Sequence, residues 1–149
     1  MRRYFMSILF GCLLTTGTPA QEFINTDKSR ATVNLEAFYP GTHSPAQWKG
    51  DSLKAAITDS LTVVFVYDAR GLCESEIFIC PGDMLFTRQL EKILGKTKYQ
   101  WKRLNENQFV SRFEDGLLLE ISPEPPQRLF TVIRTGWTRE IYELLLKQE

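Results

Sequence analysis

The sequence predicts an α+β fold: a mainly antiparallel sheet of about five strands, with helices on one face and one disulfide. Three observations favour this class. Residues 63–66 are apolar without interruption, as in a central strand. Residues 84–94 repeat apolar side chains at helical spacing, and residues 109–121 hold two alternating segments around a glycine turn. The chain therefore contains strong signals for both helices and strands.

The stretch before the central strand is predicted to hold one strand and two short helices. Residues 32–39 alternate between apolar and polar side chains, which favours a strand. Ser44, followed by a proline and then by Gln47, forms a capping box and predicts a helical turn from that point. Asp51 is placed to cap a second short helix over residues 52–58.

The central strand is predicted over residues 61–68. Because its apolar run does not alternate, we expect both faces of this strand to be covered. A helix is predicted over residues 84–94, with Asp83 as its cap and Gly95 as its stop.

The last third of the chain predicts an antiparallel meander and a terminal helix. The meander strands are expected over residues 99–104, 109–113, 117–121 and 128–134. Two turns compete before residue 117. A two-residue turn splits the apolar side chains between two faces, whereas a three-residue turn pairs Phe113 with Leu117 and Phe109 with Ile121 on one face. We favour the second turn because it buries the apolar residues together.

The terminal helix is predicted to begin after Thr138, which is placed as its cap. Trp137, just before the cap, is expected to pack on Tyr142. The stripe expected to be buried consists of Ile141, Leu144 and Leu145.

Cys73 and Cys80 are predicted to form a disulfide that staples the loop between the central strand and the helix. Closing a loop this short contributes about 2.5 kcal/mol in the chain-entropy model. The order of strand, cysteine and helix resembles that of thioredoxin-like proteins, which implies thiol–disulfide exchange as an alternative. The third cysteine, Cys12, is not expected to carry a lipid anchor, because Phe10 is bulky where lipid-attachment signals have a small residue.

The first 20 residues have the three parts of a secretory signal peptide: two arginines near the start, an apolar stretch, and small residues before position 21. The apolar stretch has about 11 residues, which is short of the roughly 20 needed to cross a bilayer. We therefore expect a signal peptide over residues 1–20 and a single exported α+β domain over residues 21–149. Its expected location is the periplasm or the extracellular space.

Charge and motifs give little sign of chemistry. The chain has 18 basic and 18 acidic side chains, interspersed, which leaves no electrostatic footprint for nucleic acid. No cofactor, phosphate-loop or metalloprotease motif is present. The single histidine, His43, is expected to be a loop residue. Two adjacent carboxylate pairs are expected to be solvated loop charges: Glu74 with Glu76, and Glu114 with Asp115.

One group of polar residues is a candidate binding surface. In the favoured register Arg112 and Glu120 fall on the sheet face opposite the apolar one, and Lys102 and Arg134 can join them. Together they form a mixed, mildly basic surface able to contact a protein partner. The function predicted from this surface, and from the lack of any catalytic constellation, is protein binding.

Within that class the sequence favours an inhibitor, an immunity-type protein or an assembly factor of a bacterial envelope. The alternative is an envelope enzyme, most specifically a thioredoxin-like thiol–disulfide oxidoreductase. A second alternative is a secreted effector. No cofactor is expected in the favoured case.

Overall fold

The computed structural model describes residues 23–122 and 128–148. The strands are β1 (Gln47–Lys49), β2 (Ser52–Ala56), β3 (Thr62–Tyr67), β4 (Cys73–Cys80), β5 (Lys102–Asn105), β6 (Gln108–Val110), β7 (Leu117–Ser122) and β8 (Arg128–Arg134). The α-helices are α1 (Ala31–Phe38), α2 (Asp83–Leu94) and α3 (Arg139–Leu146), and the 3-10 turns are η1 (Lys28–Arg30) and η2 (Thr97–Tyr99). The predicted signal peptide lies outside the described residues.

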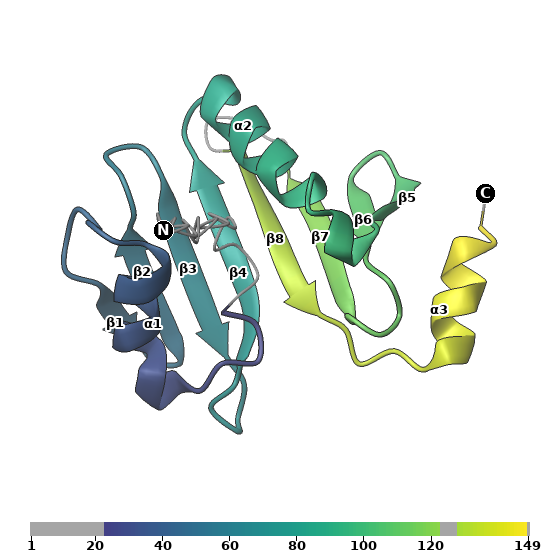
Figure 1. The fold of residues 1–149 in the computed structure, drawn as a ribbon, viewed down its shortest axis with the longest axis horizontal. Coiled ribbons are helices and arrows are strands. Elements are labelled where there is room, and N and C mark those ends of the chain that lie inside the picture. Colours follow the sequence, from purple (N-terminus) through teal and green to yellow (C-terminus); the bar gives the residue numbers. More distant parts are fainter. Residues whose placement is uncertain (1–22, 123–127, 149) are drawn as a thin grey trace, which may run out of the picture.

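All eight strands form one antiparallel sheet in the order β1-β2-β3-β4-β8-β7-β6-β5. This order divides the sheet into two similar halves, each a helix followed by a four-stranded meander. The halves meet where β4 pairs with β8, and Figure 1 shows α1 and α2 lying over the same side of the sheet. The predicted antiparallel α+β character is present, but the predicted count of about five strands is wrong.

The core lies between the sheet and the helices α1 and α2. At its centre Phe78 of β4 stacks on Phe130 of β8, with ring centroids 4.7 Å apart, and the edge of Phe86 from α2 meets Phe130. Under α1, Phe23 stacks on Phe65 of β3 at 3.9 Å. All of these rings are buried.

The segment predicted as a strand over residues 32–39 is the helix α1. Ala31 and Leu35 are buried one helical turn apart, whereas Val33 is 59% exposed. The apolar and polar residues alternate in the sequence, but the buried side chains follow helical spacing. Asp27 caps the 3-10 turn η1, which leads into this helix. Its carboxylate accepts a hydrogen bond from the backbone N–H of Ser29.

The two short helices predicted before the central strand are instead the hairpin β1–β2. Lys49 pairs with Ser52, so Gly50 and Asp51 form a two-residue turn, with Gly50 at φ +60°. A positive φ at this turn favours glycine. Asp51, which is predicted to cap a helix, thus lies in a hairpin turn, and pairing of β2 with β3 stabilises the hairpin.

The predicted loop between the cysteines is the central strand β4, and the predicted disulfide is wrong. Cys73 and Cys80 stand at opposite ends of this strand, and both are free and buried. At about 3.3 Å per residue their Cα atoms are about 23 Å apart, whereas a disulfide requires less than about 7 Å. The two cysteines are close in sequence but far apart in space, because the chain between them is an extended strand.

The register of the meander differs from the favoured one by two residues. Phe109 pairs with Leu119 rather than with Ile121. The connection from β6 to β7 is longer than a three-residue turn, because Ser111 N–H bonds to Leu117 O and the residues between them form a separate loop. A shift of two residues keeps the side chains of β6 and β7 on their predicted faces.

The terminal helix α3 begins where predicted, and the Thr138 hydroxyl accepts from the backbone N–H of Ile141. Its predicted buried stripe is wrong, however, because Ile141 and Leu144 are exposed. The helix is held instead by Tyr142, whose hydroxyl donates to Ser111 O at 2.9 Å. Figure 1 shows α3 beyond the β5–β6 end of the sheet, away from the central strands.

Candidate functional site

The most distinctive surface of the described chain is the sheet face that turns away from α1 and α2, called here the open face. Strand pairing arranges fifteen residues of this face in three rows across β2, β3, β4, β8 and β7. The rows are Ala56, Thr62, Ile79, Leu129, Ser122; Lys54, Val64, Ile77, Thr131, Glu120; and Ser52, Val66, Ser75, Ile133, Leu118. Eight of the fifteen are apolar, so the centre of this face is aliphatic.

The open face is only partly buried. Thirteen of its side chains have intermediate exposure, while Lys54 and Glu120 are exposed. Their neighbours on the same strands, such as Val63, Phe65 and Phe78, are almost completely buried on the helix side. α1 and α2 therefore cover one face of the sheet, and no described helix forms a second layer over the other face of β2, β3, β4, β8 and β7.

This arrangement corrects the expectation that both faces of the central strand are covered. The apolar run of β3 sends Val63 and Phe65 into the core and Val64 and Val66 to the open face. Strands with two apolar faces are typical of sheets that are covered on both sides. β3 thus carries more apolar side chains than the described core buries. The additional ones, Val64 and Val66, mark the open face as a candidate site.

The structure places the four residues predicted as a partner surface in separate parts of the molecule. Glu120 lies on the open face, where it accepts a hydrogen bond from Gln108 Nε2. Lys102 is on β5 at the far end of the sheet, and Arg112 lies in the loop after β6, paired with Asp115 at 2.8 Å. The Arg134 side chain hydrogen-bonds residues of the same chain.

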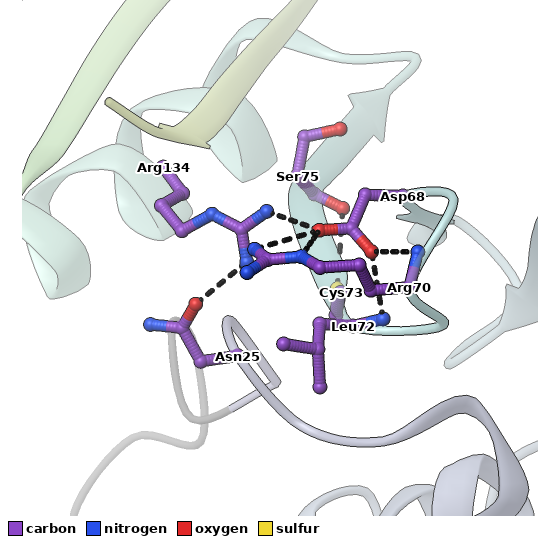
Figure 2. A network of polar contacts seen from close by, with 7 residues as sticks. All are labelled: Asn25, Asp68, Arg70, Leu72, Cys73, Ser75 and Arg134. Atoms are coloured by element: carbon purple, nitrogen blue, oxygen red, sulfur yellow. Dashed lines mark hydrogen bonds and ion pairs between the residues drawn. The ribbon is translucent and has the colours of Figure 1, made fainter. Parts of the chain in front are cut away.

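Arg134 is part of a clamp that joins three distant segments, as Figure 2 shows. Its guanidinium donates to Asp68 Oδ2 at 2.6 Å and to Asn25 Oδ1 at 2.7 Å. Asp68 follows β3 and also accepts from the backbone N–H groups of Arg70 and Leu72. The clamp therefore fixes the end of β8 to the β3–β4 turn and to the N-terminal segment.

The Asp68 carboxyl has a pKa well below its ordinary value of 3.8. The backbone N–H of Leu72 is the main cause, followed by Arg134 and Arg70, because all of them favour the ionised form. The folded state then binds fewer protons than the unfolded state at pH values below about 4. Asp68 thus stabilises the fold above this range, and the contribution is lost as the pH falls through it.

We expect the free energy of unfolding to drop between pH 5 and pH 2, and to drop less steeply in Asp68→Asn, whose side chain does not titrate. The measurement is urea unfolding of both proteins across this range. Equal slopes for the two proteins would show that Asp68 has no linkage to folding. Arg134→Lys is the matched variant, since it keeps the charge and removes the two-pronged contact.

The two cysteines lack the environment of a redox pair. Burial raises the pKa of the Cys73 thiol well above its ordinary value and that of Cys80 to about 11. The Cys73 thiol donates to Ser75 O at 3.5 Å. Reactive thiols require a lowered pKa and access to a partner, so this geometry does not supply thiol–disulfide exchange between the two residues.

Thiol chemistry tests this account directly. We expect the native protein to react very slowly with a thiol reagent and the urea-unfolded protein to expose Cys73 and Cys80. A reductant is expected to leave the unfolding midpoint unchanged, where a disulfide staple would have been worth about 2.5 kcal/mol. A midpoint that falls on reduction, or the lack of these free thiols after unfolding, would contradict the structure.

A second polar group is buried beneath α1. Glu76 is fully buried and accepts a hydrogen bond from the Phe23 backbone N–H at 3.1 Å. The hydroxyls of Tyr39 and Tyr67 are buried nearby in the core and have no hydrogen-bond partner among the described residues. Burial raises the pKa of both tyrosines well above the ordinary value, so both remain neutral donors. The prediction that Glu76 is a solvated loop charge is wrong.

Tyr39 also lines a groove of about 510 Å³ between α1 and β1–β2. Leu35, Trp48 and Leu53 contribute apolar surface to this groove, and Glu36 contributes a charge. The exposed Glu36 carboxylate can hydrogen-bond a small molecule in this groove, whereas the Tyr39 hydroxyl is buried. No cysteine is among the described residues that line this groove.

The remaining candidates for catalysis are surface ion pairs. His43 Nε2 lies 2.5 Å from Asp59 Oδ1, and both side chains are exposed. Glu114 pairs with Arg139, and its pKa is lowered, mainly by a hydrogen bond with its own backbone N–H. A lowered pKa is the opposite of what a general acid needs near neutral pH.

The described residues contain neither a metal-binding cluster nor a membrane-spanning helix. Between residues 23–122 and 128–148, no cluster of three or more histidine, cysteine or acidic side chains is placed to hold a metal ion. No described helix is sufficiently long and apolar to pass through a membrane.

Comparison with known proteins gives no match: no protein-family model fits the chain, and no curated protein or solved structure is significantly similar to it.

Proposed function

We propose that the protein is a protein-binding module and that its binding surface is the open face of the sheet. The observation that carries this proposal is the aliphatic centre of that face, built from β3, β4, β8 and β7 and left without a covering layer by the described helices. Contiguous apolar patches with polar rims are typical of interaction sites. Burial of Val64, Ile77 and Ile133 against a partner supplies the driving force.

The rim of the open face supports a protein partner. Lys54 stands on β2 at one side, and Glu120 stands on β7 at the other. An apolar centre bordered by charges matches the usual anatomy of a protein interface. The side chains are also short and branched, so they lose little conformational freedom when a partner covers them.

The test is capture of a partner by the tagged chain and by two matched variants. Ile77→Asp places a charge in the centre of the open face, and Val33→Asp places the same charge on the exposed side of α1. We expect the unmodified chain and Val33→Asp to hold the same stoichiometric partner, whether another protein or a second copy, and Ile77→Asp to lose it. Circular dichroism checks that each variant is folded.

Two outcomes would overturn this function. One is a partner that remains bound to folded Ile77→Asp, because the open face would then not be the binding surface. The other is a chain that neither self-associates nor captures any protein.

Export from the cytoplasm is a second part of the proposal. This part is supported by residues 1–20 alone. Cys73 and Cys80 are free, so they give no evidence that the chain folds in an oxidising compartment. In an envelope, the binding module acts as an inhibitor, an immunity-type protein or an assembly factor. Intact mass of the chain purified from its own cells is expected to show Gln21 as the first residue, and a chain that keeps residues 1–20 would contradict export.

A further inference from the structure

We propose that the occupant of the open face is a second copy of this chain, packed face to face around a two-fold axis that runs along β4. The inference rests on the proposed function, because it names the partner of that same surface. It follows from the positions of the charges and apolar side chains in the three rows across the open face.

The two charged residues of the open face lie in the same row. Reading across the strands, this row is Lys54, Val64, Ile77, Thr131 and Glu120. Lys54 and Glu120 are thus each two strands away from Ile77, on opposite sides. A two-fold axis along β4 exchanges the two sides, so it places Lys54 of each copy over Glu120 of the other.

The same axis brings apolar side chains together. Val66 of one copy lies over Ile133 of the other, because these residues flank β4 in one row. Ile77 and Ile79 lie on the axis and meet their own counterparts. An isologous interface requires this kind of self-complementarity, in which one patch provides both partners of every contact.

The face has the size of a specific interface. Five strands about 4.8 Å apart span about 24 Å, and each contributes a length of about 20 Å. The flat footprint is therefore about 500 Å² per copy before the relief of the side chains is counted. Specific interfaces begin at roughly 600 Å² of accessible surface per partner, which a corrugated face of this footprint reaches.

The N-terminal segment is a less suitable occupant. The chain enters the described part at Phe23, on the covered side of the sheet, where the ring stacks on Phe65. The helix α3 is also unsuitable, because Figure 1 places it beyond the β5–β6 end. A second copy does not have to reach the open face from another part of the same chain, and it covers the apolar faces of both chains at once.

The experiment uses charge reversal at the two rim positions. In the proposed dimer Lys54→Glu brings two acidic residues together at each rim contact, and Glu120→Lys brings two basic residues together. Each single variant is expected to weaken dimerisation about tenfold or more. Mixing the two single variants restores opposite charges at both rim contacts, so an equimolar mixture is expected to form a heterodimer of nearly native affinity.

Sedimentation equilibrium of the full chain, each variant and the mixture measures these affinities. The matched control is Glu36→Lys, which reverses an exposed charge on α1 and is expected to leave the dimer unchanged. Lys54 and Glu120 are exposed, so both reversals are compatible with folding, and circular dichroism verifies it.

Three results would overturn the proposal: an unmodified chain that stays monomeric at high concentration, single variants that dimerise as well as the unmodified chain, or a mixture that remains monomeric. A monomeric chain that still captures another protein, and loses it in Ile77→Asp, overturns the dimer while leaving the proposed function in place. A monomeric chain that captures no protein overturns both.

Discussion

Phe130→Ala is expected to lower the free energy of unfolding by about 3–5 kcal/mol, a large share of the roughly 5–15 kcal/mol that stabilises a domain of this size. Phe130 is completely buried, stacks on Phe78 and meets the edge of Phe86. It thus joins both halves of the sheet and α2 at one point. Removal of the ring leaves a cavity where rigid strands on both sides prevent collapse.

Urea unfolding at a fixed protein concentration measures this loss, since association alters apparent stability. The control is Val33→Ala on the exposed side of α1, which is expected to change the stability by less than about 0.5 kcal/mol. A loss below about 1 kcal/mol for Phe130→Ala would mean that the two halves of the sheet do not share a core at this position.

Phe23→Ala is expected to have a comparable effect, about 3–5 kcal/mol, although Phe23 precedes all of the described helices and strands. Its ring is fully buried, stacked on Phe65 at 3.9 Å and set edge-on against Phe38 at 5.6 Å. The ring therefore fastens α1 to β3. Loss of this contact leaves α1, only eight residues long, with little to hold it on the sheet.

Urea unfolding followed by circular dichroism measures this second effect. Phe23→Leu is the matched variant, because it keeps most of the apolar volume and is expected to cost less than Phe23→Ala. Equal stability of Phe23→Ala and the unmodified chain would contradict the placement of the N-terminal segment against β3.

The elements that the sequence predicts correctly are those whose local signals agree with their tertiary environment. β3 combines an apolar run with β-branched residues, and α2 has a buried face at helical spacing with Gly95 at its end. β8 also matches its predicted range of residues 128–134. In these segments packing reinforces the intrinsic preference.

The errors arise where short segments depend on distant partners. Residues 52–58 carry a helix-like pattern, but pairing with β3 makes residues 52–56 a strand. α1 is the reverse case, because a strand-like alternation becomes a helix when Leu35 reaches the core. Neither outcome is encoded within the segment itself, since both depend on contacts with residues elsewhere in the chain.

Only part of the candidate site can be predicted from the sequence. Glu120 lies on the open face, whereas Arg134 forms the clamp with Asp68. The stronger signal lay in the apolar residues. The runs in β3 and β4 supply side chains to both faces of the sheet, whereas the sequence predicts that both faces of the central strand are covered.

One face of the sheet forms the core, and the other is the proposed binding surface, so neighbouring residues of β4 are expected to respond differently to an introduced charge. Ile77 lies on the open face and Phe78 on the core face. The decisive measurement is cooperative unfolding of Ile77→Asp and Phe78→Asp, followed by circular dichroism. We expect the Ile77→Asp protein to be folded and the Phe78→Asp protein to be unfolded. Loss of folding in both variants would show that the open face is covered within the chain itself.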